Sequence, residues 1–184
     1  MRIAVTGTHG SGKTTLIDDF SEWHPGYERE LEPYWALAQN GVPFADGVSL
    51  PDLEEQLEAS IRMIAARAED PDVIFDRCPV DFIAYLEVVA EKEGGEWMPT
   101  GKMLTGIERS LNAIDLLVFL PLQKPDEIGT KIEFPRLRSK VDARLKSILR
   151  DDSLGLLSSS GARLLELRGS RQQRLGKLSE AAVE

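Results

Sequence analysis

The 184-residue sequence contains a single cysteine, so no disulfide bond can form within the chain. One thiol suits a reducing compartment, and we expect a cytoplasmic protein. Long apolar runs are also missing, because the first residues lead through one short apolar segment into a glycine-rich stretch. We therefore expect neither a signal peptide nor a membrane span. With 42% hydrophobic residues the chain has enough apolar side chains for one sizeable core, which predicts a single domain over residues 1–184.

Basic residues are scarce relative to acidic ones, with 22 Lys and Arg against 31 Asp and Glu. The resulting net charge of −9 argues against a general nucleic-acid-binding protein. The deficit lies in residues 1–120, which carry 9 basic and 22 acidic residues, whereas residues 121–184 carry 13 and 9. This basic C-terminal third either faces an anionic small molecule or forms solvated surface.

Short apolar runs alternate with longer helical patterns, which is typical of a parallel sheet covered by helices. The expected strands are 2–7, 73–77, 116–121 and 163–168, with a weaker fifth strand near 27–31. The near-continuous apolar character of the first four suits strands that are buried on both faces. The expected helices are 13–22, 53–68, 79–92, 102–113, 139–150 and 171–182. The sequence thus predicts the α/β class, with a five-stranded parallel sheet between two helical layers.

A complete phosphate-loop motif follows the first expected strand. Its residues Gly7-Thr8-His9-Gly10-Ser11-Gly12-Lys13-Thr14 match G-x-x-x-x-G-K-[ST], with an apolar strand before and a helix after. The glycines allow successive backbone N–H groups to turn inward, and the start of the helix adds partial positive charge. Lys13 would reach the terminal phosphates, and the Thr14 hydroxyl would bind Mg²⁺. We therefore predict a P-loop NTPase fold that binds ATP with Gly7, Thr8, His9, Gly10, Ser11, Gly12, Lys13, Thr14 and Thr15.

His9 occupies a variable position of this motif and has no evident partner in the sequence. We interpret it as a solvent-exposed loop histidine rather than as a catalytic group.

A second group of polar residues lies in the segment VIFDRCPVDFIAY. Asp76 ends a buried strand, and ligands of open parallel sheets bind at that end, so its carboxylate would lie beside the phosphate loop and serve the magnesium ion. Arg77 at the end of a core strand requires a partner or a polar cleft. The alternative is that Asp76 caps a helix and Arg77 is solvated. Cys78 is interpreted as a packing residue rather than a nucleophile.

Residues 122–138 combine two prolines, a glycine and many charges between an expected strand and an expected helix. This composition predicts a mobile loop or lid, which we place at about 122–140. Arg136 and Arg138 would move over the transferred phosphate, neutralise its charge and exclude water. The alternative is that both arginines belong to the solvated beginning of a helix.

The loop GTHGSGKTT, the pair Asp76-Arg77 followed by CPVDFIAYL, and the closing segment LELRGSRQQRLGKL resemble small P-loop kinases of the NadR type within the AAA-domain ATPase family. The kinase domain of NadR phosphorylates nicotinamide riboside. A more distant resemblance is to deoxynucleoside and nucleoside-monophosphate kinases. The resemblance implies an ATP-dependent kinase fold with a five-stranded parallel core and a lid carrying arginines. It also implies that Arg174 stacks on adenine, although a C-terminal amphipathic helix would look the same.

Kinases of this kind often place a glutamate followed by proline at the end of the second strand, near the acceptor hydroxyl. The resemblance therefore implies this position for Glu32, which precedes Pro33. NadR-type kinases more usually have an arginine close after this glutamate, whereas Tyr34 and Trp35 stand here. The alternative is that Glu32 is a surface residue in an acidic patch with Glu28 and Glu30.

Phosphoryl transfer requires neutralised charge on the transferred group and an aligned acceptor oxygen, usually with a carboxylate near its proton. Either Glu32 or Asp76 would serve as that carboxylate. Because the two acids follow different strands, we place Glu32 near the acceptor and Asp76 toward magnesium. The predicted catalytic residues are Lys13, Glu32, Asp76, Arg77, Arg136 and Arg138.

These observations predict an enzyme that transfers phosphate from ATP and Mg²⁺ to a small-molecule acceptor, such as a nucleoside, a nucleotide or a related metabolite. We expect a monomer or homodimer without nucleic-acid or membrane partners. The alternatives are a P-loop ATPase, a nucleotide-gated regulatory protein, or a degenerate fold kept for interaction. A GTPase is disfavoured because the sequence contains no N-K-x-D segment.

Overall fold

The computed structural model describes residues 1–39, 48–123 and 133–183. Its centre is a five-stranded parallel sheet with the strand order β2-β3-β1-β4-β5. The strands are β1 (Arg2–Thr6), β2 (Glu28–Glu30), β3 (Val73–Asp76), β4 (Leu116–Phe119) and β5 (Arg163–Glu166). The predicted α/β class and the five parallel strands are therefore confirmed.

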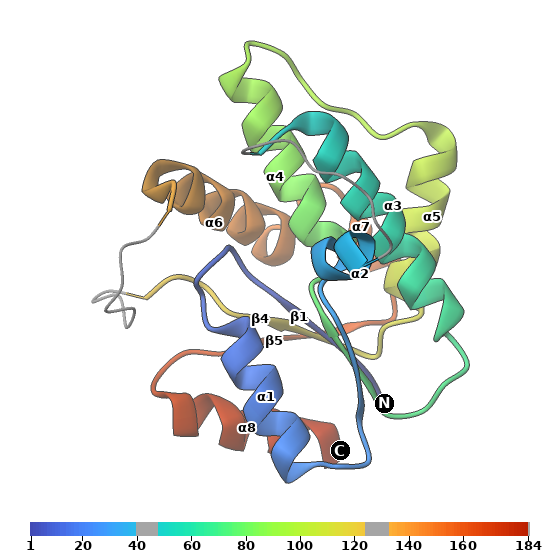
Figure 1. The fold of residues 1–184 in the computed structure, drawn as a ribbon, viewed down its shortest axis with the longest axis vertical. Helices are drawn as coiled ribbons and strands as arrows, with labels where there is room; N and C mark the ends of the chain where they lie inside the picture. Colours follow the sequence, from blue (N-terminus) through green and yellow to red (C-terminus); the bar gives the residue numbers. More distant parts are fainter. Residues whose placement is uncertain (40–47, 124–132, 184) are drawn as a thin grey trace.

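Helices cover both faces of this sheet (Figure 1). They are α1 (Lys13–Trp23), α2 (Pro33–Gln39), α3 (Leu50–Ala66), α4 (Pro79–Lys92), α5 (Gly101–Asn112), α6 (Pro135–Arg150), α7 (Leu156–Ser159) and α8 (Arg171–Val183). Two of them, α2 and α7, were not predicted from the sequence. Both are short, with 7 and 4 residues, so they offer little helical periodicity to detect.

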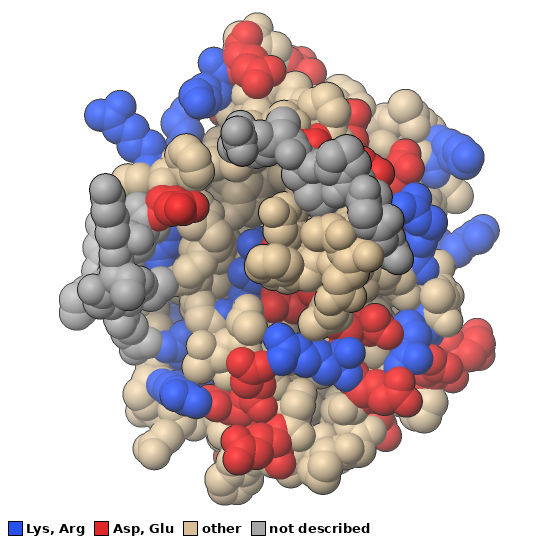
Figure 2. Space-filling model, viewed as in Figure 1, with Lys and Arg blue, Asp and Glu red and all other residues tan. Residues whose placement is uncertain are grey.

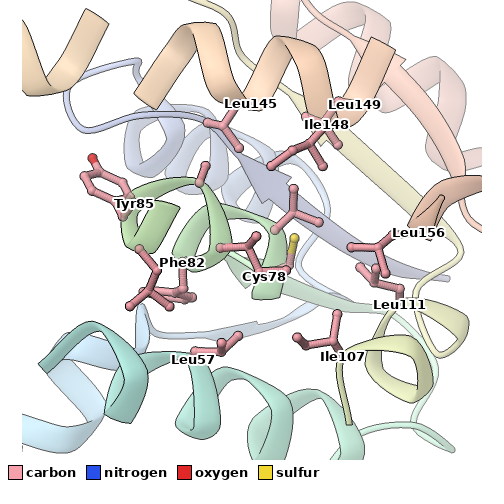
Figure 3. Packing of buried hydrophobic residues seen from close by; sticks show 14 of the residues in the cluster. Leu57, Cys78, Phe82, Tyr85, Ile107, Leu111, Leu145, Ile148, Leu149 and Leu156 are labelled. Carbon is pink, nitrogen blue, oxygen red and sulfur yellow. The ribbon is translucent and has the colours of Figure 1, made fainter. Parts of the chain in front are cut away.

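Two apolar clusters form the core, one on each side of the sheet. The larger cluster joins one face of the sheet to α3, α4, α5, α6 and α7, and it includes Leu57, Phe82 and Leu145 (Figure 3). The smaller cluster joins the other face to α1 and α8 and includes Phe20 and Leu178. The three central strands are buried on both faces, as their apolar sequences predict.

The prediction of two-sided burial is wrong for the segment 163–168. Strand β5 lies at the edge of the sheet, and its first two residues, Arg163 and Leu164, are exposed. The charged residues Arg163 and Glu166 within the segment already mark this strand as different from the central three.

The predicted beginning of the helix at residue 139 is also wrong. Helix α6 starts four residues earlier, at Pro135, so both Arg136 and Arg138 lie in its first turn rather than in a loop. Proline interrupts a helix in its interior, yet it is well tolerated in the first turn because its missing N–H has no intrahelical partner there. The rest of the predicted lid falls mainly on residues 124–132, which lie outside the described residues.

The register of the central strands determines which residues meet at the carboxyl edge of the sheet. Val5 pairs with Asp76 and Thr6 with Phe119, so β1, β3 and β4 end at nearly the same level. The loop that follows β1 and the polar residues that follow β3 are consequently neighbours. Within the described parts of the chain, no helix combines the length and the apolar character that a membrane crossing requires.

Candidate functional site

The phosphate loop connects β1 to α1, as the motif predicts. Gly7 packs so closely on the residue after β4 that an added Cβ would lie 2.8 Å from the carbonyl oxygen of Leu120. Gly12 precedes α1 with a φ of 91°, a conformation that side-chain-bearing residues rarely adopt. These two glycines therefore shape the loop, and the loop brings Lys13 to the first position of α1.

Lys13 is buried and points back into its own loop, where its ammonium donates to the carbonyl oxygen of Thr8 at 3.3 Å. Burial lowers the pKa of Lys13 to about 8, and the nearby charge of Arg77 acts in the same direction. The carboxylates of Asp76, Asp81 and Glu32 only partly oppose this effect. The nearby carboxylates therefore do not fully stabilise the buried ammonium of Lys13, and the negative charge of a bound polyphosphate would do so.

Asp76 lies beside this loop, as predicted from its place at the end of β3. The Thr14 hydroxyl donates to Oδ2 of Asp76 at 3.0 Å, whereas Oδ1 is buried and has no hydrogen-bond partner among the described residues. Burial raises the pKa of Asp76, and repulsion from Glu32 adds to the shift, although Lys13 opposes it. A buried carboxylate that lacks a partner for one oxygen is a suitable ligand for a cation.

Magnesium in nucleotide-binding sites is usually held by one or two protein oxygens together with phosphates and water. The adjacent oxygens of Thr14 and Asp76 fit this requirement. Among the described residues there is no group of three His, Cys, Asp or Glu side chains that would bind a metal without such help. The pair therefore suits a magnesium ion that arrives with a nucleotide.

Arg77 follows β3 with a φ of 78°, which is an unfavourable conformation for a residue other than glycine. Its guanidinium is buried and forms an ion pair with Glu32, and it also donates to the carbonyl oxygen of Gly7 at 3.2 Å. The alternative of a solvated arginine is therefore wrong, and Cys78, not Asp76, is the N-cap of α4. Backbone strain and a buried charge at one residue are a combination that occurs at functional sites.

Glu32 is not the surface residue of the alternative interpretation, because its side chain is only 23% exposed and is paired with Arg77. Burial by itself would raise the pKa of Glu32, but the charges of Arg77 and Lys13 and the hydrogen bond from Arg77 outweigh it. The pKa of Glu32 is therefore lowered, and the carboxylate is ionised at neutral pH. Burial raises the pKa of Asp76, so the pKa values of the two acids beside the loop are shifted in opposite directions.

Two residues of α4 that the sequence analysis did not single out complete this group. Asp81 is fully buried, and it accepts from the backbone N–H of Gly7 at 2.9 Å and from Arg77 at 3.5 Å. Tyr85 contacts Thr8 and His9 with its hydroxyl. Asp81 and Tyr85 are four residues apart, so they face the loop from one side of α4, and Arg77 reaches the same group from the segment before the helix. In the sequence, these two polar residues four positions apart in an otherwise apolar helix are the pattern that could have identified them.

His9 is partly buried and has partners, so its interpretation as a solvent-exposed histidine is wrong. Its Nδ1 lies 2.8 Å from the Tyr85 hydroxyl, and its Nε2 lies 2.8 Å from the carbonyl oxygen of Glu133. Burial lowers the pKa of His9, and the neighbouring Arg77, Arg138 and Lys13 add to the shift. The sequence could not reveal these partners, because they are 76 and 124 residues away along the chain.

Three arginines of the basic C-terminal third lie against the outer side of the loop. Arg138, Arg171 and Arg174 line a cavity of about 200 Å³ together with Gly10, Ser11, Gly12, Thr15, Leu16, Pro121, Leu122 and Gln123. The Arg138 guanidinium donates to the carbonyl oxygens of His9 and Gly10, both at 2.9 Å, and Arg174 donates to that of Ser11 at 3.4 Å. Arg136 is exposed and does not line this cavity.

The space-filling view shows the same arrangement of charge (Figure 2). Lys and Arg side chains lie inside a hollow of the face that Figure 1 presents, near the loop that follows β1. Acidic and basic side chains are interspersed on the outer surface below the hollow. A positive interior in an otherwise acidic protein favours an anionic ligand.

The comparisons with known proteins agree with this geometry. Residues 2–174 match the family model described as "AAA domain". The chain belongs to this family. None of the curated proteins has a sequence that matches the chain.

Several solved structures share its fold. Deoxyadenosine kinase from M. mycoides with bound dATP is 15% identical, with a TM-score of 0.63 and 100% of both chains covered. Thymidylate kinase from Candida albicans is 16% identical, with a TM-score of 0.58, and the match covers 98% of this chain and 89% of the kinase. The YorR protein from Bacillus subtilis, in complex with phosphorylated GDP, is 16% identical with a TM-score of 0.54, covering 100% and 96%. This AAA-domain protein therefore has the P-loop fold of nucleoside and nucleotide kinases.

Proposed function

We propose that this AAA-domain protein is a kinase that transfers the γ-phosphate of ATP to a hydroxyl or phosphate oxygen of a nucleoside-like or nucleotide-like acceptor. One observation carries the proposal: a second carboxylate, Glu32, is held by Arg77 beside the phosphate loop, in addition to the acid that faces Thr14. Transfer to any attacking oxygen needs the loop and the magnesium site. A separate, ionised and oriented carboxylate is what an acceptor hydroxyl requires.

The donor would bind through the phosphate loop. Its backbone N–H groups and the Lys13 ammonium would contact the phosphates, and the charge of the nucleotide would stabilise the ionised form of Lys13. Thr14 and Asp76 would hold magnesium, which supplies neutralisation of the phosphate charge when it is bound. The cavity next to Gly12 would receive the nucleoside part, with Arg174 and Arg138 at its border.

The acceptor would bind on the other side of the loop, where Glu32 lies. Glu32 would accept a hydrogen bond from the attacking hydroxyl, and Arg77 would keep the carboxylate ionised and oriented. Two aromatic residues follow directly on α2, where Tyr34 and Trp35 lie edge to face with ring centroids 5.0 Å apart. The Trp35 side chain is 57% exposed, which makes it available to a planar acceptor.

The experiment is a screen for ADP release that depends on an added acceptor, with ATP and Mg²⁺ as donor. Nucleosides, nucleoside monophosphates and nicotinamide riboside form the acceptor set, and phosphorylated products are identified by mass spectrometry. The Lys13→Ala variant controls for contaminating kinases. ADP release that no acceptor accelerates would contradict the proposal and would favour the alternative of an ATPase or a nucleotide-gated protein.

A further inference from the structure

Two variable positions of the phosphate-loop motif have specific partners in this chain. The motif requires no particular residue at positions 8 and 9, yet both Thr8 and His9 contact the hydroxyl of Tyr85. The Tyr85 oxygen lies 3.0 Å from the backbone nitrogen of His9, 2.8 Å from its Nδ1 and 3.3 Å from the Thr8 hydroxyl. One phenolic group therefore holds the tip of the loop at three atoms.

The direction of these hydrogen bonds follows from the chemistry of the partners. The carbonyl oxygen of Glu133 can only accept, so Nε2 of His9 carries a proton and donates to it. The lowered pKa of His9 makes the imidazole neutral at neutral pH, which leaves Nδ1 without a proton. The Tyr85 O–H therefore donates to Nδ1, and its oxygen accepts from the backbone N–H of His9 and from the Thr8 hydroxyl.

Tyr85 is well suited to hold a position, because its ring is fixed in the core. The side chain is only 7% exposed and belongs to the larger apolar cluster. Figure 3 shows its ring at the border of that cluster, with the hydroxyl directed away from the other labelled side chains. The Arg77 guanidinium lies 5.6 Å from the ring centroid, which further restricts the ring. A rigid aromatic ring transmits the position of α4 to the loop.

The opposite side of the loop tip is attached to the beginning of α6. Arg138 donates to the carbonyl oxygens of His9 and Gly10, and the His9 side chain donates to the carbonyl oxygen of Glu133, two residues before α6 starts. The segment Thr8 to Gly10 therefore lies between two helices. Its conformation depends on α4 through Tyr85 and on α6 through Arg138.

We propose that Tyr85 is a positioning residue for the nucleotide donor, acting through Thr8 and His9 to fix the phosphate-loop amides and to connect α4 with the arginine-bearing start of α6. The role of Tyr85 in catalysis rests on the proposed function, but the effect of Tyr85 on ATP binding can be measured without an acceptor. Tyr85 itself would not touch the nucleotide. Its contribution is that the loop amides have their binding geometry before the phosphates arrive.

The test is the Tyr85→Phe variant, which keeps the buried ring and removes only the hydroxyl. Without it, the His9 N–H and Nδ1 lose their partner, and the loop tip is free to rotate. We expect ATP affinity, measured by calorimetry without acceptor, to weaken about tenfold, which corresponds to the loss of one or two net hydrogen bonds. In the kinase assay the KM for ATP should rise, while the KM for the acceptor stays unchanged.

Two further variants separate positioning from general destabilisation. Tyr27→Phe removes a hydroxyl from a tyrosine that packs against Phe20 in the smaller cluster, and it should leave ATP affinity within about twofold of the wild type. His9→Leu removes both ring nitrogens. If Tyr85 acts through His9, the ATP affinity of the double variant Tyr85→Phe, His9→Leu should fall by a smaller factor than the product of the factors for the two single variants.

The outcomes distinguish this inference from the proposed function. Unchanged ATP affinity in Tyr85→Phe would overturn the inference even if the wild type is a kinase. An equal rise of both KM values, or strictly multiplicative losses in the double variant, would also overturn it, since either result indicates a diffuse structural effect. If Tyr85→Phe weakens ATP binding but no acceptor accelerates ADP release by the wild type, the inference is supported while the proposed kinase reaction fails.

Discussion

Glu32 and Arg77 form an ion pair that joins the ends of two neighbouring strands. In the register of β2 and β3, Glu30 pairs with Phe75, so Glu32 and Arg77, each two residues further along, both follow these strands at the same edge of the sheet. The strained φ of Arg77 turns its side chain toward this partner and toward the carbonyl oxygen of Gly7. The pair thus connects the proposed acceptor carboxylate directly to the phosphate loop.

The pair leads to a prediction about catalysis and stability. Glu32→Gln should lower kcat at least about a hundredfold with little change in ATP affinity, because the amide cannot take the acceptor proton. Arg77→Ala should lower the free energy of unfolding by about 3–5 kcal/mol, because it leaves a mostly buried carboxylate without its partner. Steady-state kinetics and urea unfolding provide the measurements. A fully active Glu32→Gln variant would transfer the role of base to Asp76.

Replacing Asp76 should lower activity without lowering the stability of the folded protein. Asp76→Asn should reduce turnover by about two orders of magnitude or more, because the amide is a poor magnesium ligand. The folded-state pKa of Asp76 lies above its ordinary 3.8, so the ionised form destabilises the folded protein, and this cost grows as the pH rises through that pKa. Without magnesium, the variant should therefore melt at the same or a higher temperature than the wild type at pH 7. A large fall in its melting temperature would show that the carboxylate is structural.

Lys13 should make ATP affinity depend on pH. Its folded-state pKa of about 8 lies below the ordinary 10.5, so the empty protein loses this positive charge as the pH rises above 8. ATP binding requires the charged lysine, and the affinity should consequently fall by up to about tenfold per pH unit above pH 8. Calorimetric titrations between pH 7 and pH 9.5 measure this slope. The Lys13→Met variant, which has no ammonium, should bind ATP weakly and with the same affinity across this range.

The two arginines at the start of α6 provide a matched comparison. Arg138 is buried against the loop, whereas Arg136 is exposed, and they lie in the same helical turn. Arg138→Ala should lower kcat/KM for ATP more than tenfold, because the carbonyl oxygens of His9 and Gly10 lose their donor. Arg136→Ala should stay within about twofold of the wild type. If the two variants are equally impaired, the effect belongs to the charge of the segment and not to the contacts of Arg138.

A further readout assigns the role of Arg138. An arginine that acts on the transferring phosphate would chiefly lower kcat, because its interaction strengthens in the transition state. An arginine that holds the shape of the loop would chiefly weaken ATP binding. The hydrogen bonds from Arg138 to two loop carbonyl groups favour the second result.

The sequence determined the parts of this protein that depend on local chemistry. The complete motif around Lys13 specifies a strand, a turn rich in glycine and a helix, and near-continuous apolar runs identify the three central strands. Asp76 was placed correctly next to the loop because the ends of parallel strands meet at one edge of the sheet. Each of these conclusions rests on residues that are close in sequence or on a general property of parallel sheets.

Only the tertiary structure decided which distant side chains act together. Tyr85 and His9 are 76 residues apart, and His9 and Arg138 are 129 residues apart, so no local pattern connects them. The sequence also left open whether Glu32 is a surface residue, because burial of a charge depends on a partner that another strand supplies. The register of β2 and β3 supplies that partner in Arg77. Contacts between segments that meet only in the folded sheet determine the charge state and the orientation of these groups, and a motif describes neither.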